Sequence, residues 1–573
     1  MWCKLIFRCY LVCAVLFGGK TVNGQPHPVI ITEVYPDPDN KAGLPVAEFI
    51  ELKNVSANTI NLKSWRITDG SSTATINKEL LLKADSFIVI CPNSAAGSFM
   101  IEVNVVGVSS FPSLNNDADL ISLLDDKGKN IHTIYYNNEW HSNDLKKSGG
   151  WTLEMIDFNN PCGGKSNWAS SVHPAGGTPG AVNSVYAPNP DEQPPALLRT
   201  YLADPRTLVA VFDEPLDSIT AMNHLMYRLV LPGAQVNGVS FLTRMHNEVV
   251  IHLSEVLMPE IINTLTVTQL RDCAGNEIGM FNNAKFGAPS IAAAGDLVLN
   301  ELLFNPVGAG FDYVEMVNKS SKVIDLQTIY IAGKNSTGAI NDPIQISSDH
   351  RLLMPGGYVV ATRNETWLTQ QYVVKDLSTI CQTPAFPSMP DDKGYLAILN
   401  HQGEVIDEVA YSDKWHFALL NNKDGVALER LDYAQPTQEP TNWTSAASAA
   451  GFGTPGYQNS QFRSGGIAAG SFVIDDKIFS PDGDGHQDYV TIRYTMPEPG
   501  YMGSLSIYDL AGKPVRYLLK SGLLGLNGVV TWNGLNEMNN RLPVGQYIIL
   551  MEIFNLKGKT QRFKGSVALV RRF

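Results

Sequence analysis

The feature that most constrains this chain is a long internal repeat, in which the same strand-like segments occur twice. Residues 48–54 (EFIELKN) alternate apolar and polar side chains, and residues 312–318 (DYVEMVN) do the same far downstream. Such alternation is typical of a β-strand with one buried face. Each segment follows an apolar stretch that contains a glutamate, Glu33 in the first copy and Glu301 in the second. The long period indicates a duplicated domain, not a short-period solenoid.

Further landmarks recur in the same order in both copies: FPS at 111–113 and 386–388, WH at 140–141 and 415–416, NW at 167–168 and 442–443, and GTPG at 177–180 and 453–456. Together with residues 48–54, Leu62 and Trp65, these motifs resemble the lamin tail domain. The resemblance implies an immunoglobulin-like β-sandwich for residues 27–186 and again for residues 295–462. Ile329 stands where the first copy has Trp65, so we expect a differently packed core there. The resemblance implies no particular activity, because such sandwiches host many unrelated functions.

At 573 residues the chain is too long for one hydrophobic core. Residues 1–24 are predicted to be a cleaved signal peptide, with Lys4 and Arg8 before a short apolar run and small residues before Gln25. No later stretch reaches the length of about 18 apolar residues that a spanning helix needs. The sequence therefore predicts an exported chain of several domains.

Two further domains are predicted from turn and strand patterns. Residues 193–289 follow a proline-rich linker and resemble the bacterial immunoglobulin-like spacer of surface-layer proteins. Residues 470–573 resemble the immunoglobulin-like domain of flagellar hook-capping proteins and the C-terminal sorting domains of type IX secretion cargo. The predicted fold class is all-β, with tandem immunoglobulin-like β-sandwich domains in an elongated multidomain chain.

The strongest candidate for a metal site is the spacing Asp482-x-Asp484-x-x-x-Asp488. Calcium prefers several hard oxygen ligands on a tightly curved loop, and Gly483 and Gly485 permit such curvature. The segment resembles the opening of an EF-hand loop but lacks the closing glutamate, for which Asp475 or Asp476 is a candidate. Calcium is therefore the only cofactor expected. The alternative is an ordinary Asp/Gly turn that holds no ion.

The repeated glutamates Glu33, Glu51, Glu301 and Glu315 could be paired carboxylates for acid–base chemistry. They lie on central-looking strands, however, where a glutamate usually accepts hydrogen bonds from loop amides or pairs with a lysine. His141 and His416 each follow a tryptophan and are expected to be packed, hydrogen-bonded side chains. No nucleophile elbow, zinc-protease motif or phosphate-binding glycine loop occurs. The sequence therefore predicts no catalytic residues and no enzyme.

Four of the seven cysteines lie beyond the predicted signal peptide: Cys91, Cys162, Cys273 and Cys381. Their spacing matches no common metal motif. We expect buried free thiols, with a Cys91–Cys162 disulfide as the alternative in an oxidising compartment.

The charge argues against nucleic acid as a partner. The formal net charge is −13, and loss of the three basic residues and no acid in residues 1–24 leaves −16. Phosphate backbones bind to basic patches, which such a surface lacks.

The favoured function is an exported binding scaffold whose loops contact a protein or glycan at the cell surface. The alternatives are a secretion or envelope-assembly accessory, whose C-terminal domain docks to outer-membrane secretion machinery, and a secreted hydrolase with a site not visible in the sequence. The basic residues between Lys557 and Arg572 are the candidate docking signal.

Overall fold

The computed structural model describes residues 27–39, 41–100, 103–230, 235–463 and 470–571. The chain divides into two compact units, Met1–Val256 with Asn263–Lys285, and Leu257–Ile262 with Phe286–Phe573. The predicted signal peptide lies outside the described residues. Within the described residues, no helix has both the length and the apolar character needed to cross a membrane.

The first lamin-tail-like module is a sandwich of two main sheets. The six-stranded sheet has the order β12 (Trp168–Ser170), β11 (Leu153–Met155), β1 (Val29–Tyr35), β2 (Phe49–Asn54), β7 (Phe87–Pro92), β8 (Val105–Val108). The four-stranded sheet has the order β10 (Asn130–Asn137), β9 (Ala118–Leu124), β4 (Arg66–Thr68), β5 (Thr73–Thr75). Apolar side chains of both sheets form one core that includes Val34, Ile50 and Ile121.

The second module repeats this topology strand for strand. Its six-stranded sheet has the order β31 (Trp443–Ser445), β30 (Leu428–Arg430), β20 (Leu297–Leu303), β21 (Tyr313–Asn318), β26 (Tyr358–Thr362), β27 (Ile380–Gln382). Its four-stranded sheet has the order β29 (Val405–Ser412), β28 (Lys393–Asn400), β23 (Ile329–Lys334), β24 (Ile340–Gln345). Even the parallel pair recurs, as β7 with β8 and as β26 with β27. Ile329 is buried in the second core as Trp65 is in the first.

The central strands of each six-stranded sheet are buried on both faces. Every residue of β1, β2, β20 and β21 is buried. One face packs on the four-stranded sheet, and the other lies under loops and small apolar clusters that include Phe49 in the first copy and Tyr313 in the second. The polar residues of the alternating pattern therefore point into the protein and need internal hydrogen-bond partners.

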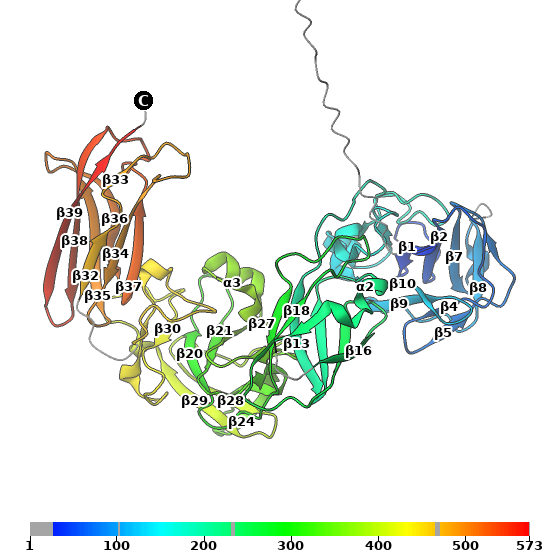
Figure 1. Ribbon diagram of the computed structural model, residues 1–573, viewed down its shortest axis with the longest axis horizontal. Helices are drawn as coiled ribbons and strands as arrows, with labels where there is room; N and C mark the ends of the chain where they lie inside the picture. The colour runs from blue at the N-terminus through cyan, green and yellow to red at the C-terminus, as the bar shows by residue number, and fades with distance from the viewer. Residues whose placement is uncertain (1–26, 40, 101–102, 231–234, 464–469, 572–573) are drawn as a thin grey trace, which may run out of the picture. The chain divides into compact units, whose positions relative to one another are not determined.

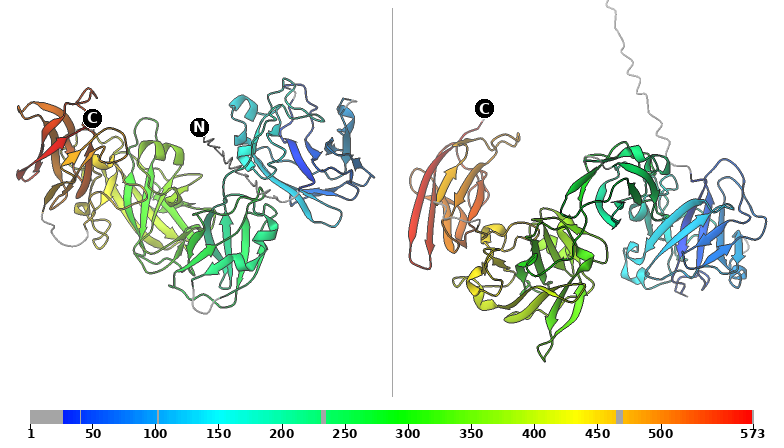
Figure 2. Two further views of the ribbon diagram at one scale, coloured as in Figure 1. Left: turned by 45° about the horizontal axis from the view of Figure 1, so that its top comes forward. Right: turned by 60° about the horizontal axis from the view of Figure 1, so that its bottom comes forward.

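The two remaining domains are also sandwiches (Figures 1 and 2). The domain predicted at residues 193–289, which we call the spacer domain, has two sheets. One has the order β13 (Leu197–Asp204), β14 (Thr207–Phe212), β17 (Glu248–Leu253), β16 (Val236–Phe241), and the other has the order β15 (Tyr227–Leu229), β18 (Asn263–Val267), β19 (Asn283–Phe286). The C-terminal domain, orange to red in Figure 1, has sheets β32 (Ser471–Ile474), β34 (Val490–Thr495), β37 (Asn527–Trp532) and β33 (Ile478–Phe479), β39 (Thr560–Leu569), β38 (Gly545–Asn555), β35 (Tyr501–Tyr508), β36 (Pro514–Leu523). The expected all-β fold class is confirmed.

Candidate functional site

Three glutamates lie side by side on neighbouring strands of each six-stranded sheet. In the first module Glu33 pairs in register with Glu51 of β2 and with Glu154 of β11. In the second module Glu301 pairs in the same way with Glu315 of β21 and Glu429 of β30. We call these the first and second glutamate triads; all six side chains are buried.

The first triad holds the GTPG segment, residues 177–180, which we call the first closing loop. The Thr178 amide donates to Glu33 Oε1 at 2.8 Å, and the Gly180 amide donates to Glu51 Oε2 at 2.6 Å. The Thr178 hydroxyl donates to Glu154 Oε1 at 2.9 Å. Each glutamate therefore anchors a different donor of one short loop.

The second triad holds its own closing loop, residues 453–456, in the same way. The Gly456 amide donates to Glu315 Oε2 at 2.6 Å, and the Thr454 amide donates to Glu301 Oε1 at 2.9 Å. The Thr454 hydroxyl lies 2.7 Å from Glu301 Oε2 and 2.9 Å from Glu429 Oε1. This hydroxyl has one hydrogen and can donate to only one of the two carboxyls. The other contact is a hydrogen bond only if that carboxyl carries a proton.

Burial favours the protonated carboxyl at Glu33, Glu51, Glu301, Glu315 and Glu429. Burial, reinforced by the neighbouring Glu154, raises the pKa of Glu33 to about 8. Burial and the neighbouring Glu429 raise the pKa of Glu301 to about 8 as well. Burial likewise raises the pKa values of Glu51, Glu315 and Glu429. Glu33 Oε2 has no hydrogen-bond partner in the described structure, which further disfavours a charge there.

The triads confirm the expectation that these glutamates accept hydrogen bonds from loop amides. Glu154 and Glu429 were not predicted, because each lies in a strand of only three residues, too short to show alternation. The available signal was their constant position, 13 residues before the NW motif in both copies.

His141 and His416 are also equivalent and structural. The Nδ1 atom of His141 lies 2.8 Å from the Ser170 hydroxyl, and Nδ1 of His416 lies 2.8 Å from the Ser445 hydroxyl. Burial lowers the pKa of each histidine to about 4. Both side chains are packed and hydrogen-bonded, as the sequence predicts.

The predicted calcium ligands are brought together in the C-terminal domain. Ligand atoms of Asp482, Asp484 and Asp488 all lie within 4.8 Å of one another. Asp488 accepts hydrogen bonds from the amides of Gly483 at 2.6 Å and Gly485 at 2.9 Å. Asp475, a candidate for the closing ligand, instead forms an ion pair with Arg493.

We expect calcium to stabilise this loop. Free calcium at about 100 times its dissociation constant should raise the free energy of unfolding of the C-terminal domain by about 2.7 kcal/mol. Calorimetric melts of the whole chain with calcium and with chelator measure this, and Asp484→Asn should reduce the calcium effect. If melts of the wild-type chain with calcium and with chelator superimpose, the loop is an ordinary Asp/Gly turn that holds no ion.

A second carboxylate cluster is formed by Asp191 of the proline-rich linker with Glu214 and Asp272 of the spacer domain, whose ligand atoms lie within 4.8 Å of one another. Burial and the carboxylate of Asp272 raise the pKa of Glu214 to about 9. Asp272 accepts hydrogen bonds from the amides of Gly275 and Asn276. Asp217, another acid of this segment, caps the short helix α2 (Ser218–Ala221).

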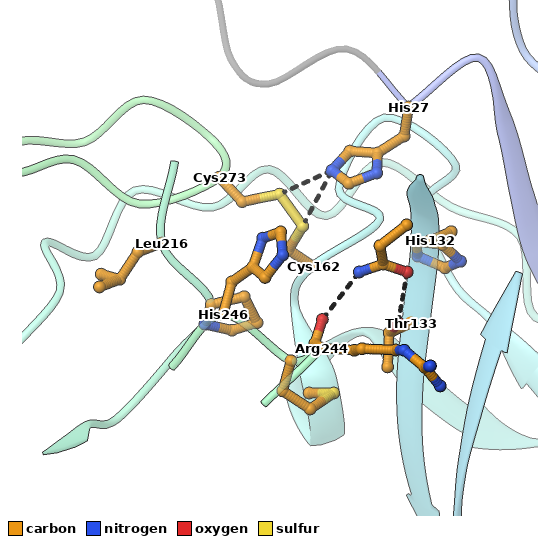
Figure 3. Close-up of a pocket in the computed structure, with 11 residues that line it drawn as sticks. His27, His132, Thr133, Cys162, Leu216, Arg244, His246 and Cys273 are labelled. Atoms are coloured by element: carbon orange, nitrogen blue, oxygen red, sulfur yellow. Dashed lines mark hydrogen bonds between the residues drawn. A yellow bond between two sulfur atoms is a disulfide. The ribbon is translucent and has the colours of Figure 1, made fainter. Parts of the chain in front are cut away.

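The structure corrects the disulfide prediction. Cys162 pairs with Cys273, with their Cα atoms 6.2 Å apart, whereas Cys91 and Cys381 are buried free thiols. Cys91 lies within strand β7 in an apolar cluster with Phe49, so it is packed away from the loop that carries Cys162. The bond links the first lamin-tail-like module to the spacer domain (Figure 3). Sequence spacing gives no sign of this pairing, because the two cysteines are 111 residues apart and lie in different domains.

Strand β10 organises the surroundings of this disulfide. The Asn130 side-chain amide donates to the Arg244 carbonyl of the spacer domain at 2.9 Å. His132 Nδ1 accepts from the Ile31 amide at 3.0 Å, so its Nε2 donates to the Pro161 carbonyl at 3.0 Å. These bonds fix the loop of Cys162 against the sheet.

Comparison with known proteins supports the lamin-tail resemblance for the first module. The family model of the Lamin Tail Domain matches residues 23–138. No curated protein matches the sequence. Among solved structures, the N-terminal part of the bacterial S-layer protein SbsC is 16% identical, over 29% of this chain and 40% of that chain, with a TM-score of 0.16.

Two other solved structures are similar to this chain at comparably low sequence identity. A DUF4876 family protein from Bacteroides thetaiotaomicron is 11% identical over 32% of this chain and 77% of that chain, with a TM-score of 0.17. A tetra-tandem repeat of a large adhesion protein is 11% identical over 95% of this chain and all of that chain (100%), with a TM-score of 0.12. This chain thus contains, in residues 23–138, a segment that matches the Lamin Tail Domain, within a series of β-sandwich modules.

Proposed function

We propose that this chain is an exported, non-enzymatic scaffold that binds a protein or glycan at the cell surface. The observation that supports this most is that the glutamate triads hold the closing loops of their own modules. The carboxyls that could have formed a paired acid–base site are buried, and each accepts hydrogen bonds from its own module. They hold the closing loops and leave the outer loops of the sandwiches as binding surfaces.

Surface fractionation with crosslinking tests this proposal. A membrane-impermeant lysine reagent applied to intact cells should label the chain, and a crosslinker should capture one recurrent partner. Labelling that occurs only after lysis would contradict the surface location. Turnover of a glycan or peptide substrate that is lost in both Glu33→Gln and Glu301→Gln would instead support the hydrolase alternative.

The C-terminal docking alternative depends on which basic side chains at the end of the chain are free to bind a partner. Arg571 is partly buried and donates through Nη2 to the Leu542 carbonyl at 2.7 Å. Arg562 pairs with Glu552 at 2.6 Å, and Lys557 pairs with Glu498 at 3.2 Å. Arg572 lies outside the described residues. Within the basic end, Arg562 and Lys557 are therefore paired with acidic side chains, and Arg571 contributes to the packing of the domain.

Lys559 and Lys564 are exposed and are the better positions to change. If the basic hairpin docks to export machinery, Lys559→Ser with Lys564→Ser should reduce the amount of chain at the cell surface. Exposed substitutions of this kind change stability by about 0.5 kcal/mol or less. Wild-type surface amounts of a normally folded double variant would exclude these lysines as the signal.

A further inference from the structure

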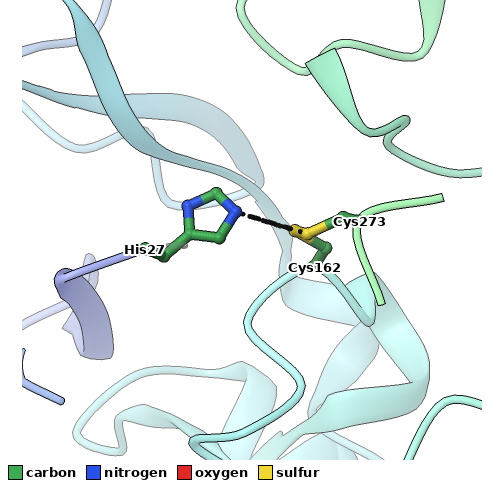
Figure 4. Close-up of side chains that lie close together, drawn as sticks. All are labelled: His27, Cys162 and Cys273. Carbon is green, nitrogen blue, oxygen red and sulfur yellow. Dashed lines mark hydrogen bonds between the residues drawn. A yellow bond between two sulfur atoms is a disulfide. The ribbon is translucent and has the colours of Figure 1, made fainter. Parts of the chain in front are cut away.

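The Cys162–Cys273 disulfide has a third potential metal ligand beside it. His27 Nε2 lies 3.5 Å from Cys162 Sγ and 3.3 Å from Cys273 Sγ (Figure 4). The three ligand atoms come from the start of the first module, from the loop between β11 and β12 and from the spacer domain. Two sulfurs and one imidazole nitrogen that converge in this way form the donor set of a thiophilic metal site.

The imidazole of His27 is held in the tautomer that a metal requires. His27 Nδ1 lies 2.6 Å from the Ile131 carbonyl, which can only accept, so Nδ1 carries the hydrogen. Nε2 therefore presents its lone pair to the two sulfurs. A disulfide has no hydrogen to donate to that lone pair. A backbone carbonyl behind Nδ1 is also the usual support of a metal-bound histidine.

The space beside the sulfurs suits one small ligand. The cavity measures about 20 Å³ and is lined by all three residues, together with Arg244, Met245 and His246 (Figure 3). A cavity needs about 10–15 Å³ to hold a single water molecule. His132 also lines it, but both of its ring nitrogens already have backbone partners.

We propose that reduction of this disulfide creates a site for one Zn²⁺ ion, bound by Cys162 Sγ, Cys273 Sγ and His27 Nε2, with water as the fourth ligand. Either the disulfide or the bound zinc ion then crosslinks the first lamin-tail-like module to the spacer domain. Zn–S bonds of about 2.3 Å in a tetrahedron place two sulfurs about 3.8 Å apart. With the Cα atoms 6.2 Å apart, side-chain rotation can supply this separation.

The chemistry balances with a dithiol as the reductant. The protein disulfide accepts two electrons and two protons and becomes two thiols, while the dithiol becomes a cyclic disulfide. Zinc binding then releases the two thiol protons to solvent and forms two Zn–S bonds. His27 contributes a neutral nitrogen, so the ion and the two thiolates sum to zero charge. A neutral cluster is less costly to bury than an unpaired ion.

The test uses residues 25–573, which lack Cys3, Cys9 and Cys13. Oxidised and dithiol-reduced chains, freed of reductant without air, are titrated with Zn²⁺ against a chromophoric chelator. Co²⁺ serves as a second probe, because thiolate coordination gives it a charge-transfer band. We expect one ion per reduced chain and none per oxidised chain at the same concentration.

The controls identify the ligands. Cys162→Ser with Cys273→Ser keeps the free thiols Cys91 and Cys381 and should abolish binding. His27→Ala should weaken Zn²⁺ binding by about 10-fold or more, and circular dichroism checks that it folds. Equal zinc binding by the oxidised and reduced chains, or full binding by the cysteine double variant, would overturn the proposal, as would no binding by a folded reduced chain.

Discussion

Reduction of the Cys162–Cys273 bond in metal-free buffer is expected to lower the free energy of unfolding of the unit that contains it by about 3–5 kcal/mol. The two cysteines are 111 residues apart in sequence. A crosslink over a loop of roughly 100 residues removes much of the conformational entropy of the unfolded chain, worth about 4.7 kcal/mol in the chain-entropy model. Denaturant unfolding with and without dithiol measures the change.

The cysteine double variant provides the matched control for this prediction. Cys162→Ser with Cys273→Ser should unfold as the reduced wild-type chain does and should not respond further to dithiol. The other described cysteines, Cys91 and Cys381, are already free thiols. An unchanged unfolding midpoint on reduction of the wild-type chain would show that the bond contributes little to stability.

Removal of a triad carboxyl should be similarly destabilising. Glu301→Ala leaves the Tyr313 hydroxyl and the Thr454 amide without their acceptor. Unsatisfied buried donors cost about 1–3 kcal/mol each, so we expect a loss of about 3–4 kcal/mol. Glu301→Gln keeps a carbonyl acceptor and should cost about 1 kcal/mol or less. Thermal unfolding of the two variants provides the comparison.

The triads also predict how stability depends on pH. The pKa of Glu33 and of Glu301 is about 8 in the folded protein, against 4.5 ordinarily. Between these values the folded state binds more protons than the unfolded state, so the contribution of these groups falls as pH rises from 4.5 to about 8. Buried histidines such as His141 act in the opposite direction at lower pH. The quantity to measure is therefore the difference in the free energy of unfolding, as a function of pH, between the wild-type chain and the double variant Glu33→Gln with Glu301→Gln. A difference that is constant over this range would contradict protonated triads.

The repeat and the all-β fold could be predicted because they depend on local pattern. Alternating strands and recurring motifs such as GTPG are visible in a single sequence, and they placed Glu51 and Glu315 at equivalent positions. The cap of α2 is equally local, since Asp217 directly precedes the helix and its carboxylate accepts from the amides of Ile219 and Thr220. These features need only a few neighbouring residues.

The candidate sites were harder to predict because they are assembled from distant residues. Cys273 lies in a different domain from Cys162, and His27 reaches them from the start of the described chain. Glu154 and Glu429 belong to strands too short to reveal a period. Arg571 belongs to the basic end of the chain, yet it is partly buried and donates to the Leu542 carbonyl. Each case depends on tertiary packing.

Amide hydrogen exchange at Gly180 and Gly456 tests most directly whether the triad carboxyls hold the closing loops in place. Both amides lie in loops outside regular strands, yet each donates at 2.6 Å to a buried carboxyl, Glu51 or Glu315. We predict that peptides covering residues 176–182 and 452–458 exchange slowly, as the central strands do, and that Glu51→Ala accelerates exchange in the first peptide only. Exchange in both wild-type peptides as fast as in the exposed turn at residues 125–129 would contradict the account.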